Sequence, residues 1–427
     1  MKNIAVLTLY SWMMCCAQPL LRRKLARRGK AEPGYLANVE ERFGHYGQPA
    51  AQTSPQDQPL VWIHAVSLGE TRAAAVLIAA LRAHLPGMKL MLTHGTATGR
   101  AEGQKLLQAG DVQTWQAWDT PAATERFITH FKPRIGIMME TELWPNMAAT
   151  CARHQVPLVL ANARMSGKTY LQTKKFAWLA RPAYQSLKAV WPQSADDAKR
   201  FAEFGAPVRG VFGNLKFDAQ VDAIQLAKGK NWKSKVHRPM VMFASSREGE
   251  ELQLLQYLQK TVAHVQWLIV PRHPQRFAEV DTLIQRHGFK VAKRSGWLDE
   301  PDATDANTIW LGDSLGEMAM YYGMSDVVLL GGSFAPLGGQ NLIEAAACGC
   351  PVVMGPSTFN FAQAAALAIQ AEAALQCPEL SAAMRAALEL VEDADRLKKM
   401  RLSALEFATS HQGAAEKTAT AVVQLLH

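Results

Sequence analysis

The chain has 427 residues, which accommodates roughly two or three domains and a large hydrophobic core. Hydrophobic residues make up 48% and charged residues 19% of it, as in an ordinary globular protein. The six cysteines form no CxxC pair and no HExxH motif occurs, so neither a disulfide framework nor a protein-held zinc site is predicted. The net charge of +9 favours an anionic partner: nucleic acid, an acidic membrane surface or a phosphorylated substrate.

The first segment, residues 1–30, combines an apolar run with a basic end. Residues 3–21 are mostly apolar, and the basic residues that follow are Arg22, Arg23, Lys24, Arg27, Arg28 and Lys30. Because a cleaved signal peptide carries its charge before the apolar run, we expect an uncleaved membrane anchor, with the rest of the chain in the cytoplasm. Gln18 and Pro19 interrupt the run, so shallow insertion and a buried first helix of a soluble domain stay open.

A first alternating set of strands and helices occupies residues 31–212. The predicted strands are Leu60–Ala65, Lys89–Thr93, Val112–Trp115, Arg134–Met139, Pro157–Ala161, Ala189–Pro192 and Val208–Val211. Helical segments lie between most of them, the first over Thr71–Leu85. This alternation predicts βαβ units and a parallel sheet, and therefore an N-terminal Rossmann-like domain.

A second alternating set follows residues 213–238, which have little apolar periodicity and are predicted to link two domains. Its predicted strands, within a domain over 239–400, are Met240–Ala244, Val265–Val270, Phe289–Val291, Thr308–Leu311, Val327–Leu330 and Pro351–Met354. We expect 401–427 to be a C-terminal helix that packs back on the first domain. The predicted fold class is therefore α/β, with two Rossmann-like domains and a ligand-binding cleft between them.

The stretch Leu330–Cys348 runs from an apolar strand through a glycine-rich loop into a helix that starts at Asn341. Glycines let the backbone approach a phosphate closely, and the N–H groups at a helix start attract its charge. Glu344, one turn into the helix, is suited to sugar hydroxyls because a carboxylate accepts their hydrogen bonds. The stretch therefore predicts a nucleotide site, with an ordinary βα turn as the alternative.

Acidic residues also stand at the ends of predicted strands in the first domain. Glu70 is suited to act as a general base if burial raises its pKa, although a first-turn acid of an ordinary helix has the same pattern. Glu140 and Glu142 follow another strand as a pair, and helix capping explains one acid better than two. Lys216 lies where the first domain ends. It could stabilise the negative charge on a departing phosphate, or it could be a solvated residue of the linker.

Two further turns of the second domain could bind an anion: the turn at Arg272 and the strand-to-helix turn Ser245–Glu250. Arg272 ends a buried strand, where a guanidinium can grip a phosphate with two hydrogen bonds, although a surface arginine in a proline-bounded turn is the alternative. Ser314 and Glu317 fit a capping box, just before the glycine-rich stretch.

Six runs of the sequence form a pattern together: Ser67–Glu70, Met139–Asn146, Ala161–Arg164, Leu215–Asp218, Val270–Pro274 and Gly338–Glu344. This pattern resembles that of the 3-deoxy-D-manno-octulosonic acid (Kdo) transferases of lipopolysaccharide assembly. The run Met-Glu-Thr-Glu-Leu-Trp-Pro-Asn is highly specific, whereas the glycine-rich loop alone matches many glycosyltransferases. The resemblance covers nearly the whole chain.

The resemblance implies a GT-B fold and transfer of Kdo from CMP-Kdo to a lipid A precursor at the cytoplasmic face of the inner membrane. It implies Glu70 as the catalytic base, with Glu140 and Lys216 stabilising the transition state. The residues implied to contact CMP-Kdo are Pro271, Arg272, Leu315, Gly316, Glu317, Asn341, Leu342, Ile343 and Glu344. The basic cluster after the apolar run is expected to attract anionic lipid headgroups, and nucleic acid is not expected because the cluster lacks interleaved stacking aromatics. No cofactor or metal is expected.

Three positions depart from the family pattern. The family often has Gly-Gly-His-Asn-Pro-Leu-Glu, so Gln340 and Leu342 differ, and Leu315 replaces a more usual methionine. Two rival functions stay open: a GT-B transferase that uses a UDP-sugar on a lipid-linked acceptor, and a non-catalytic, membrane-associated nucleotide-binding protein. The second rival would not need Glu70 or the paired acids. The number of Kdo residues transferred and the acyl pattern of the acceptor are not predicted.

Overall fold

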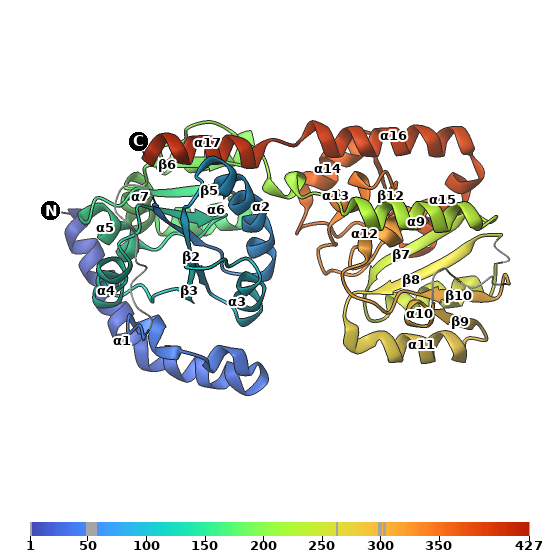
Figure 1. The fold of residues 1–427 in the computed structure, drawn as a ribbon, viewed down its shortest axis with the longest axis horizontal. Coiled ribbons are helices and arrows are strands. Elements are labelled where there is room, and N and C mark those ends of the chain that lie inside the picture. Colours follow the sequence, from blue (N-terminus) through green and yellow to red (C-terminus); the bar gives the residue numbers. More distant parts are fainter. Residues whose placement is uncertain (1, 48–57, 262–263, 298–300, 302–304, 427) are drawn as a thin grey trace. The chain divides into compact units, whose positions relative to one another are not determined.

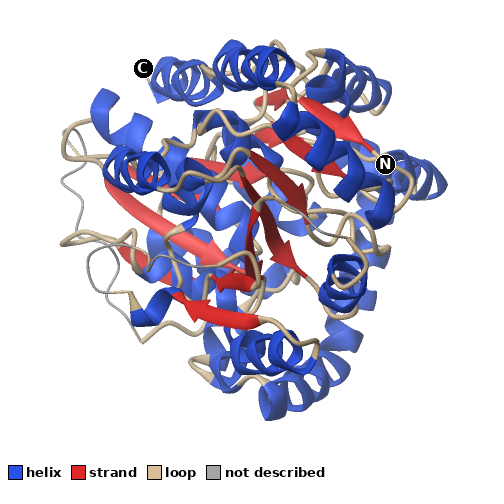
Figure 2. Ribbon diagram, turned by 90° about the vertical axis from the view of Figure 1, so that its right-hand side faces the viewer, coloured by secondary structure: helices blue, strands red, loops and turns tan. Residues whose placement is uncertain are grey.

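The computed structural model describes residues 2–47, 58–261, 264–297, 301 and 305–426. The chain forms two compact units (Figure 1): an N-terminal unit, Met1–Asp218 with Gln412–His427, and a C-terminal unit, Ala219–His411. Figure 2 shows the strands enclosed by helices. Both units are parallel α/β structures, as the sequence predicts.

The N-terminal unit is built on a parallel sheet in the order β3-β2-β1-β4-β5-β6. Its strands are β1 (Leu60–His64), β2 (Lys89–His94), β3 (Val112–Trp115), β4 (Ile135–Met139), β5 (Leu158–Ala163) and β6 (Ala189–Pro192). Its helices between strands are α2 (Leu68–His84), α3 (Ala97–Gln104), α4 (Pro121–Phe131), α5 (Pro145–Arg153), α6 (Gly167–Lys175), α7 (Ala177–Gln185) and α8 (Ala195–Glu203). Neighbouring residues of β1, Trp62 and Ile63, belong to separate hydrophobic clusters, so both faces of the sheet are buried.

The strand predicted over Val208–Val211 is wrong. Only Val208 pairs with the sheet, through an isolated bridge to Val190. The backbone of Gly210 then has a φ of 118°, a left-handed conformation that an extended strand does not contain. A short apolar run next to an edge strand therefore forms a single bridge instead of a further strand.

The C-terminal unit has a parallel sheet in the order β13-β12-β11-β7-β8-β10-β9. Its strands are β7 (Met240–Ser246), β8 (Gln266–Pro271), β9 (Lys290–Lys293), β10 (Thr308–Leu311), β11 (Val327–Leu330), β12 (Val352–Met354) and β13 (Ala374–Gln376). Its helices are α9 (Ala223–Lys235), α10 (Glu250–Leu258), α11 (Phe277–Arg286), α12 (Met318–Met324), α13 (Leu342–Ala347), α14 (Ala362–Gln370), α15 (Leu380–Glu392) and α16 (Ala394–Ser410). The short edge strand β13 has no counterpart among the predicted strands.

The segment predicted as a linker, 213–238, is largely structured. It contains the 3₁₀ turn Leu215–Asp218 and helix α9, which belongs to the C-terminal unit. Gly229 of α9 lies so close to α12 that an added Cβ would come within 2.1 Å of the Met320 carbonyl oxygen. Because a glycine makes this close helix contact, the segment carries no clear apolar stripe and resembles a linker in sequence.

The chain returns to the N-terminal unit at Gln412, so the predicted C-terminal segment 401–427 divides between the two units. Helix α17 (Ala414–Leu426) contributes Ala415, Ala419 and Val422 to a core cluster of the N-terminal unit. The carboxylate of Asp218 accepts hydrogen bonds from the backbone N–H groups of Gly413 (2.5 Å) and Ala415 (2.6 Å). Asp218 therefore caps the helix that closes this unit.

Residues Lys2–Ala31 form one long helix, α1, with Pro19 inside it. The 3₁₀ turns Pro33–Leu36 and Val39–Phe43 follow it. Among the described residues, no helix combines the length and the apolar character needed to cross a membrane. The hydroxyl of Ser11 donates a hydrogen bond to Asn146 Oδ1 (2.7 Å), which ties α1 to the start of α5.

Asp218→Ala is expected to lower the free energy of unfolding by about 1–2 kcal/mol, because it removes the cap of α17. Thermal unfolding and limited proteolysis near residues 411–415 measure the loss. Asp218→Asn keeps one acceptor oxygen and is expected to lie between the wild type and Asp218→Ala. Equal protease resistance of all three proteins would contradict the role of this cap.

Candidate active site

Glu70 is held at the carboxyl end of β1 by reciprocal contacts at the start of α2. Ser67 is the N-cap of the helix, and its hydroxyl donates to Glu70 Oε1 (2.9 Å) while accepting from the Glu70 N–H (3.4 Å). The backbone N–H of Val66 donates to Glu70 Oε2 (2.9 Å). The ordinary capping role is therefore real, and it also fixes the carboxylate in one place with lone pairs still available on both oxygens.

Burial raises the pKa of Glu70 to about 7, with the negative charges of Glu140 and Glu142 adding to the effect and the hydrogen bonds from Val66 and Ser67 opposing it. Burial also raises the pKa of Glu142. A carboxyl group with a pKa near neutrality can accept a proton at physiological pH and give it up again. A general base at Glu70 requires that burial raise its pKa, and the structure agrees with this requirement.

Glu140 directly follows β4 in a left-handed backbone conformation, with a φ of 57°. This conformation costs a non-glycine residue roughly 1–3 kcal/mol and is often found at functional sites. The Glu140 N–H donates to the carbonyl of Ala161 within β5 (3.1 Å), which holds the backbone in place. Lys216 Nζ lies 4.0 Å from Glu140 Oε1, and both side chains are half-buried. Two of the predicted catalytic residues therefore form an ion pair.

Asn162 positions the loop that carries Lys216. Its own backbone is left-handed, with a φ of 51°, and its side-chain Oδ1 accepts from the N–H of Leu215 (3.1 Å). The amide of Gln193 donates to the Asn162 carbonyl (2.9 Å). The Ala-Asn-Ala-Arg motif therefore contributes structurally, by joining the end of β5 to the Lys216 turn.

The last residue of the Met-Glu-Thr-Glu-Leu-Trp-Pro-Asn run has a structural role as well. The backbone N–H of Asn146 donates to Asp119 Oδ2 (3.0 Å) and its side-chain amide donates to the Asp119 carbonyl (2.6 Å). Through Ser11, the same side chain contacts α1. The run therefore has an acidic beginning beside Lys216 and an end that anchors the N-terminal helix.

In the C-terminal unit, the predicted donor residues follow β8, β10 and β11. Arg272 comes directly after β8, and its Nε donates to Gln340 Oε1 in the glycine-rich loop (3.1 Å). Gln340, one of the departures from the family pattern, therefore brings the predicted phosphate-binding arginine and the loop together. Pro271 is the last residue of β8 and is buried.

The glycine-rich loop is fixed by its own backbone. Gly332, Gly338 and Gly339 have φ values of 68°, 85° and 71°, which favour glycine strongly. The N–H of Gly332 donates to both carboxylate oxygens of Glu250 (2.9 Å each). Asn341 caps α13 by accepting from the Ile343 N–H (3.2 Å), as predicted.

The remaining predicted donor residues differ in exposure. Leu342 and Ile343 are buried, at 1% and 2% exposed, so they could reach a ligand only through their backbone, whereas Glu344 is half-buried. Leu315 is 72% exposed. The Glu317 carboxylate pairs with Arg294 (2.8 Å) and accepts from the Ser314 hydroxyl (2.5 Å).

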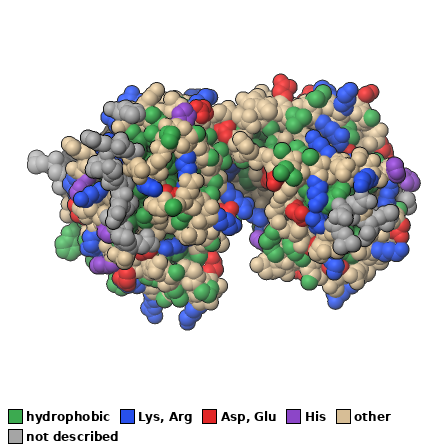
Figure 3. All heavy atoms as spheres, in the orientation of Figure 1, with side chains coloured by type: hydrophobic (Ala, Val, Ile, Leu, Met, Phe, Trp, Pro, Cys, Tyr) green, Lys and Arg blue, Asp and Glu red, His purple; other side chains and the backbone are tan. Residues whose placement is uncertain are grey.

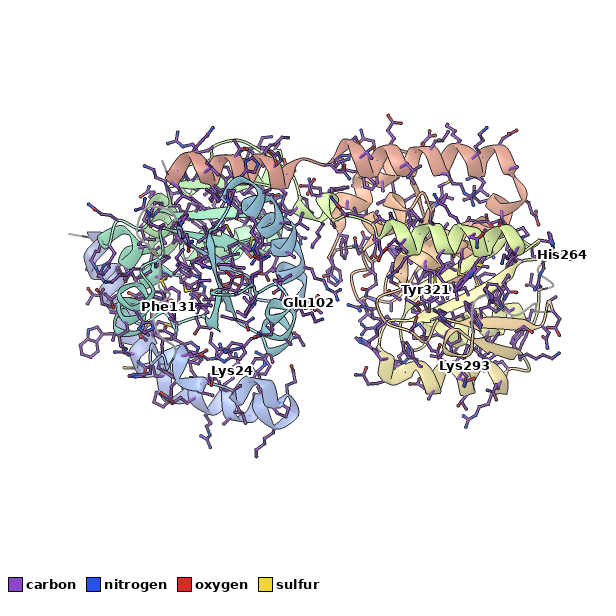
Figure 4. The ribbon with its side chains drawn as sticks, in the orientation of Figure 1. Lys24, Glu102, Phe131, His264, Lys293 and Tyr321 are labelled. Atoms are coloured by element: carbon purple, nitrogen blue, oxygen red, sulfur yellow. The ribbon has the colours of Figure 1, made fainter. Side chains whose placement is uncertain are left out.

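The Ser314–Glu317 contact predicted as a capping box is therefore present, although α12 begins later, at Met318, with Glu317 as its N-cap. Ser314 also contacts the Tyr321 hydroxyl (2.6 Å), and Tyr321 is labelled on α12 in Figure 4. The described residues contain no group of three or more His, Cys, Asp or Glu side chains placed to hold a metal ion.

A row of buried polar residues that was not predicted from the sequence lies at the edge of the sheet where β1, β2 and β3 end. His64 ends β1, His94 ends β2 and Gln116 directly follows β3, and all three are at most 4% exposed. The sequence did contain a signal for this row, because three neighbouring apolar strands each end at or next to a polar residue. The carboxyl ends of parallel strands meet at one edge of a sheet, so these residues could have been predicted to lie together.

This architecture defines a class: two parallel-sheet α/β units that resemble those of GT-B glycosyltransferases. A solved structure titled a glycosyltransferase from Rickettsia africae ESF-5 is similar over 87% of this chain and 99% of its own, with a TM-score of 0.56 and 14% sequence identity. At that identity the similarity shows the fold alone.

Sequence comparison identifies the family. The model of the 3-deoxy-D-manno-octulosonic-acid transferase family matches residues 37–219. The 3-deoxy-D-manno-octulosonic acid transferase of Bordetella pertussis is 42% identical over 95% of this chain and 96% of its own length. The enzyme of the same name from Haemophilus influenzae is 29% identical over 96% of each. The chain therefore belongs to the Kdo transferase family, and the predicted resemblance is confirmed.

Glu140→Gln is expected to lower the pKa of Glu70 from about 7, because it removes the nearby negative charge that opposes ionisation. Titration of ¹³C-carboxyl-labelled glutamate by NMR, with the Glu70 signal assigned by its loss in Glu70→Gln, measures the change. Glu142→Gln is expected to shift the pKa of Glu70 less, because the charge of Glu142 contributes less to it, and Glu102→Gln not at all, because Glu102 does not contribute to the raised pKa. An unchanged Glu70 titration in Glu140→Gln would refute the coupling.

Proposed function

We propose that this chain transfers Kdo from CMP-Kdo to a hydroxyl of a lipid A precursor, with inversion at the anomeric carbon and with Glu70 as the general base. The observation that carries the proposal is the Glu70 carboxylate, fixed by Val66 and Ser67 and with a pKa near 7, in a member of the Kdo transferase family. The names of the relatives support Kdo as the transferred sugar.

The proposed chemical step is one displacement. Glu70 removes the proton of the acceptor hydroxyl as its oxygen attacks the anomeric carbon of Kdo. The bond from that carbon to the phosphate oxygen breaks, and its electron pair leaves with CMP. A positioned base contributes about 10²–10⁴-fold to such a rate, and holding the two reactants in line adds to it.

The charge that develops on the departing phosphate needs cationic partners. Arg272 is held beside the glycine-rich loop by Gln340, and a guanidinium suits a phosphate with two hydrogen bonds. Lys216 is proposed to stabilise the transition state while Glu140 holds its ammonium group in position. The exposed edge of Leu315 and the backbone of Gly316, which has a φ of 79°, are proposed to contact the nucleotide.

We further propose that α1 attaches the enzyme to the anionic, cytoplasmic face of the inner membrane. Large apolar side chains on its first two-thirds are exposed: Leu9 by 58%, Trp12 by 69%, Met13 by 51% and Leu20 by 69%. The exposed basic residues of its last third are suited to anionic headgroups. Figure 3 shows Lys and Arg side chains projecting where this part of α1 lies. An interfacial helix of this kind inserts shallowly.

Glu70→Gln is expected to lower the transfer rate by about 10²–10⁴-fold, because an amide cannot accept the proton, while CMP binding is retained. The assay incubates the full chain with radiolabelled CMP-Kdo and a lipid A precursor, and mass spectrometry of the product counts the sugars added. Glu102→Gln is the matched control and should retain full activity. Normal turnover by Glu70→Gln would remove Glu70 from the mechanism, and transfer from UDP-sugars instead of CMP-Kdo would favour the rival transferase.

The double substitution Trp12→Ser and Leu20→Ser is expected to reduce binding to vesicles that contain anionic lipid by at least severalfold, because less apolar surface is buried. Vesicle flotation measures the bound fraction. Leu402→Ser removes a similarly exposed side chain (60%) of α16 and should leave binding unchanged. Equal flotation of the three proteins would exclude α1 as the membrane contact.

A further inference from the structure

A cavity of 330 Å³ lies within the N-terminal unit, between α1 and the carboxyl ends of β1 and β3. Its volume is near the lower end of the range of about 300–1,000 Å³ that is typical of ligand pockets. Helix α1 contributes Met14, Leu21 and Leu25 to its wall, and the other side contains His64 and Gln116. It therefore has room for a small ligand or for one part of a larger ligand.

Three polar side chains of the cavity wall are almost completely buried, and each has an unsatisfied polar atom. His64 is 0%, Arg42 4% and Gln116 4% exposed. His64 Nε2, Arg42 Nε and both amide atoms of Gln116 have no hydrogen-bond partner in the described part of the chain. Buried polar groups are usually paired, because leaving one unpaired costs about 1–3 kcal/mol. Their convergence on one cavity indicates a polar ligand group there.

The chemistry of these atoms narrows the choice of group. His64 Nδ1 contacts the carbonyl oxygen of Thr93 (3.1 Å), which favours the tautomer with a proton on Nδ1 and leaves Nε2 as an acceptor. Burial and nearby His94 lower the pKa of His64 to about 3, so the ring is neutral. Arg42 Nε can only donate, and the Gln116 amide both donates and accepts. Together they suit a hydroxyl or an amide, which also combine donor and acceptor.

One part of the cavity wall is apolar and suits a hydrocarbon chain, while the carboxyl groups of Asp119 and Glu142 belong to another part of the lining. Leu21, Leu25 and Ala117 form the apolar part, and Trp118 adds an aromatic wall. At its rim, Lys24 and Arg28 of α1 are exposed (Lys24 is labelled on α1 in Figure 4). A phosphate outside the cavity would meet these cations, while a chain inside would be shielded from water.

The cavity also adjoins the proposed base. Val66 lines it, and the N–H of the same residue donates to Glu70 Oε2 (2.9 Å). A sugar hydroxyl placed at Glu70 would therefore leave its substituents close to the cavity mouth.

We propose that this cavity binds an acyl chain of the glycolipid acceptor, with a hydroxyl or amide near the head of that chain hydrogen-bonded to His64, Gln116 and Arg42. This inference rests on the proposed function, since it assigns a position to part of the same acceptor. The cavity beneath α1 would then contribute to acceptor selection, because the enzyme would bind the acyl chain as well as the sugar.

Gln116→Leu tests the proposal, because it removes the unpaired amide with little change in volume and breaks no hydrogen bond that the described residues make with that side chain. With the full chain in mixed micelles, KM for the acylated lipid A precursor is expected to rise about three- to tenfold, as for the loss of one or two hydrogen bonds. The kcat and the KM for CMP-Kdo should not change, and Tm should be equal or higher. Equilibrium binding of the same precursor, followed by calorimetry, should weaken in parallel.

Two further variants complete the test. Met14→Trp narrows the cavity from the side of α1 and should also weaken precursor binding, whereas Gln104→Leu, the same chemical change at an exposed position of α3, should have no effect. If the wild type transfers Kdo but neither KM nor binding changes in Gln116→Leu and Met14→Trp, the acyl site is refuted and the proposed function stands. If the wild type transfers none while both variants still weaken binding, the proposed function fails and the acyl site stands. If the wild type transfers no Kdo and neither variant weakens precursor binding, both the proposed function and the acyl site are refuted.

Discussion

The arrangement of the N-terminal unit depends on one constraint: its strands are parallel, so the polar groups that follow them meet at one edge and must satisfy one another. Glu70 satisfies the N–H of Val66 and pairs with Ser67, while Glu140 is fixed by β5. Burying acids together has a cost, which is visible as the raised pKa of Glu70. The contacts that begin helix α2 therefore also fix the carboxylate that we propose as the general base.

The same edge shows how structure and chemistry share residues. Asn162 and Asn146 belong to motifs that mark the family, yet their observed contacts are structural: one holds the Lys216 turn and the other ties α5 to α1. In the C-terminal unit, Gln340 departs from the family pattern and still has a clear contact, since it accepts from Arg272. A motif can thus be diagnostic because it maintains geometry, and a residue that departs from the family pattern can still make a contact that holds the loop.

Much of the fold could be predicted because buried parallel strands are short apolar runs with sharp ends. β3, β6, β10 and β11 have the predicted bounds. The failures occurred where the local pattern is weak. Val208 makes only one bridge, β13 is a three-residue edge strand, and α9 packs through Gly229 instead of an apolar stripe. In each case, the partner that decides the outcome is distant in sequence.

The sequence by itself determined the family, the two parallel sheets and the candidate residues Glu70, Glu140, Lys216 and Arg272, because each lies at the end of a strongly apolar strand or in a specific motif. Only the tertiary structure decided how these groups act on one another: the pKa of Glu70, the pairing of Lys216 with Glu140 and the contact of Arg272 with Gln340. It alone also revealed the cavity beneath α1. Burial, charge proximity and cavities arise between segments far apart in the chain, and no local pattern encodes them.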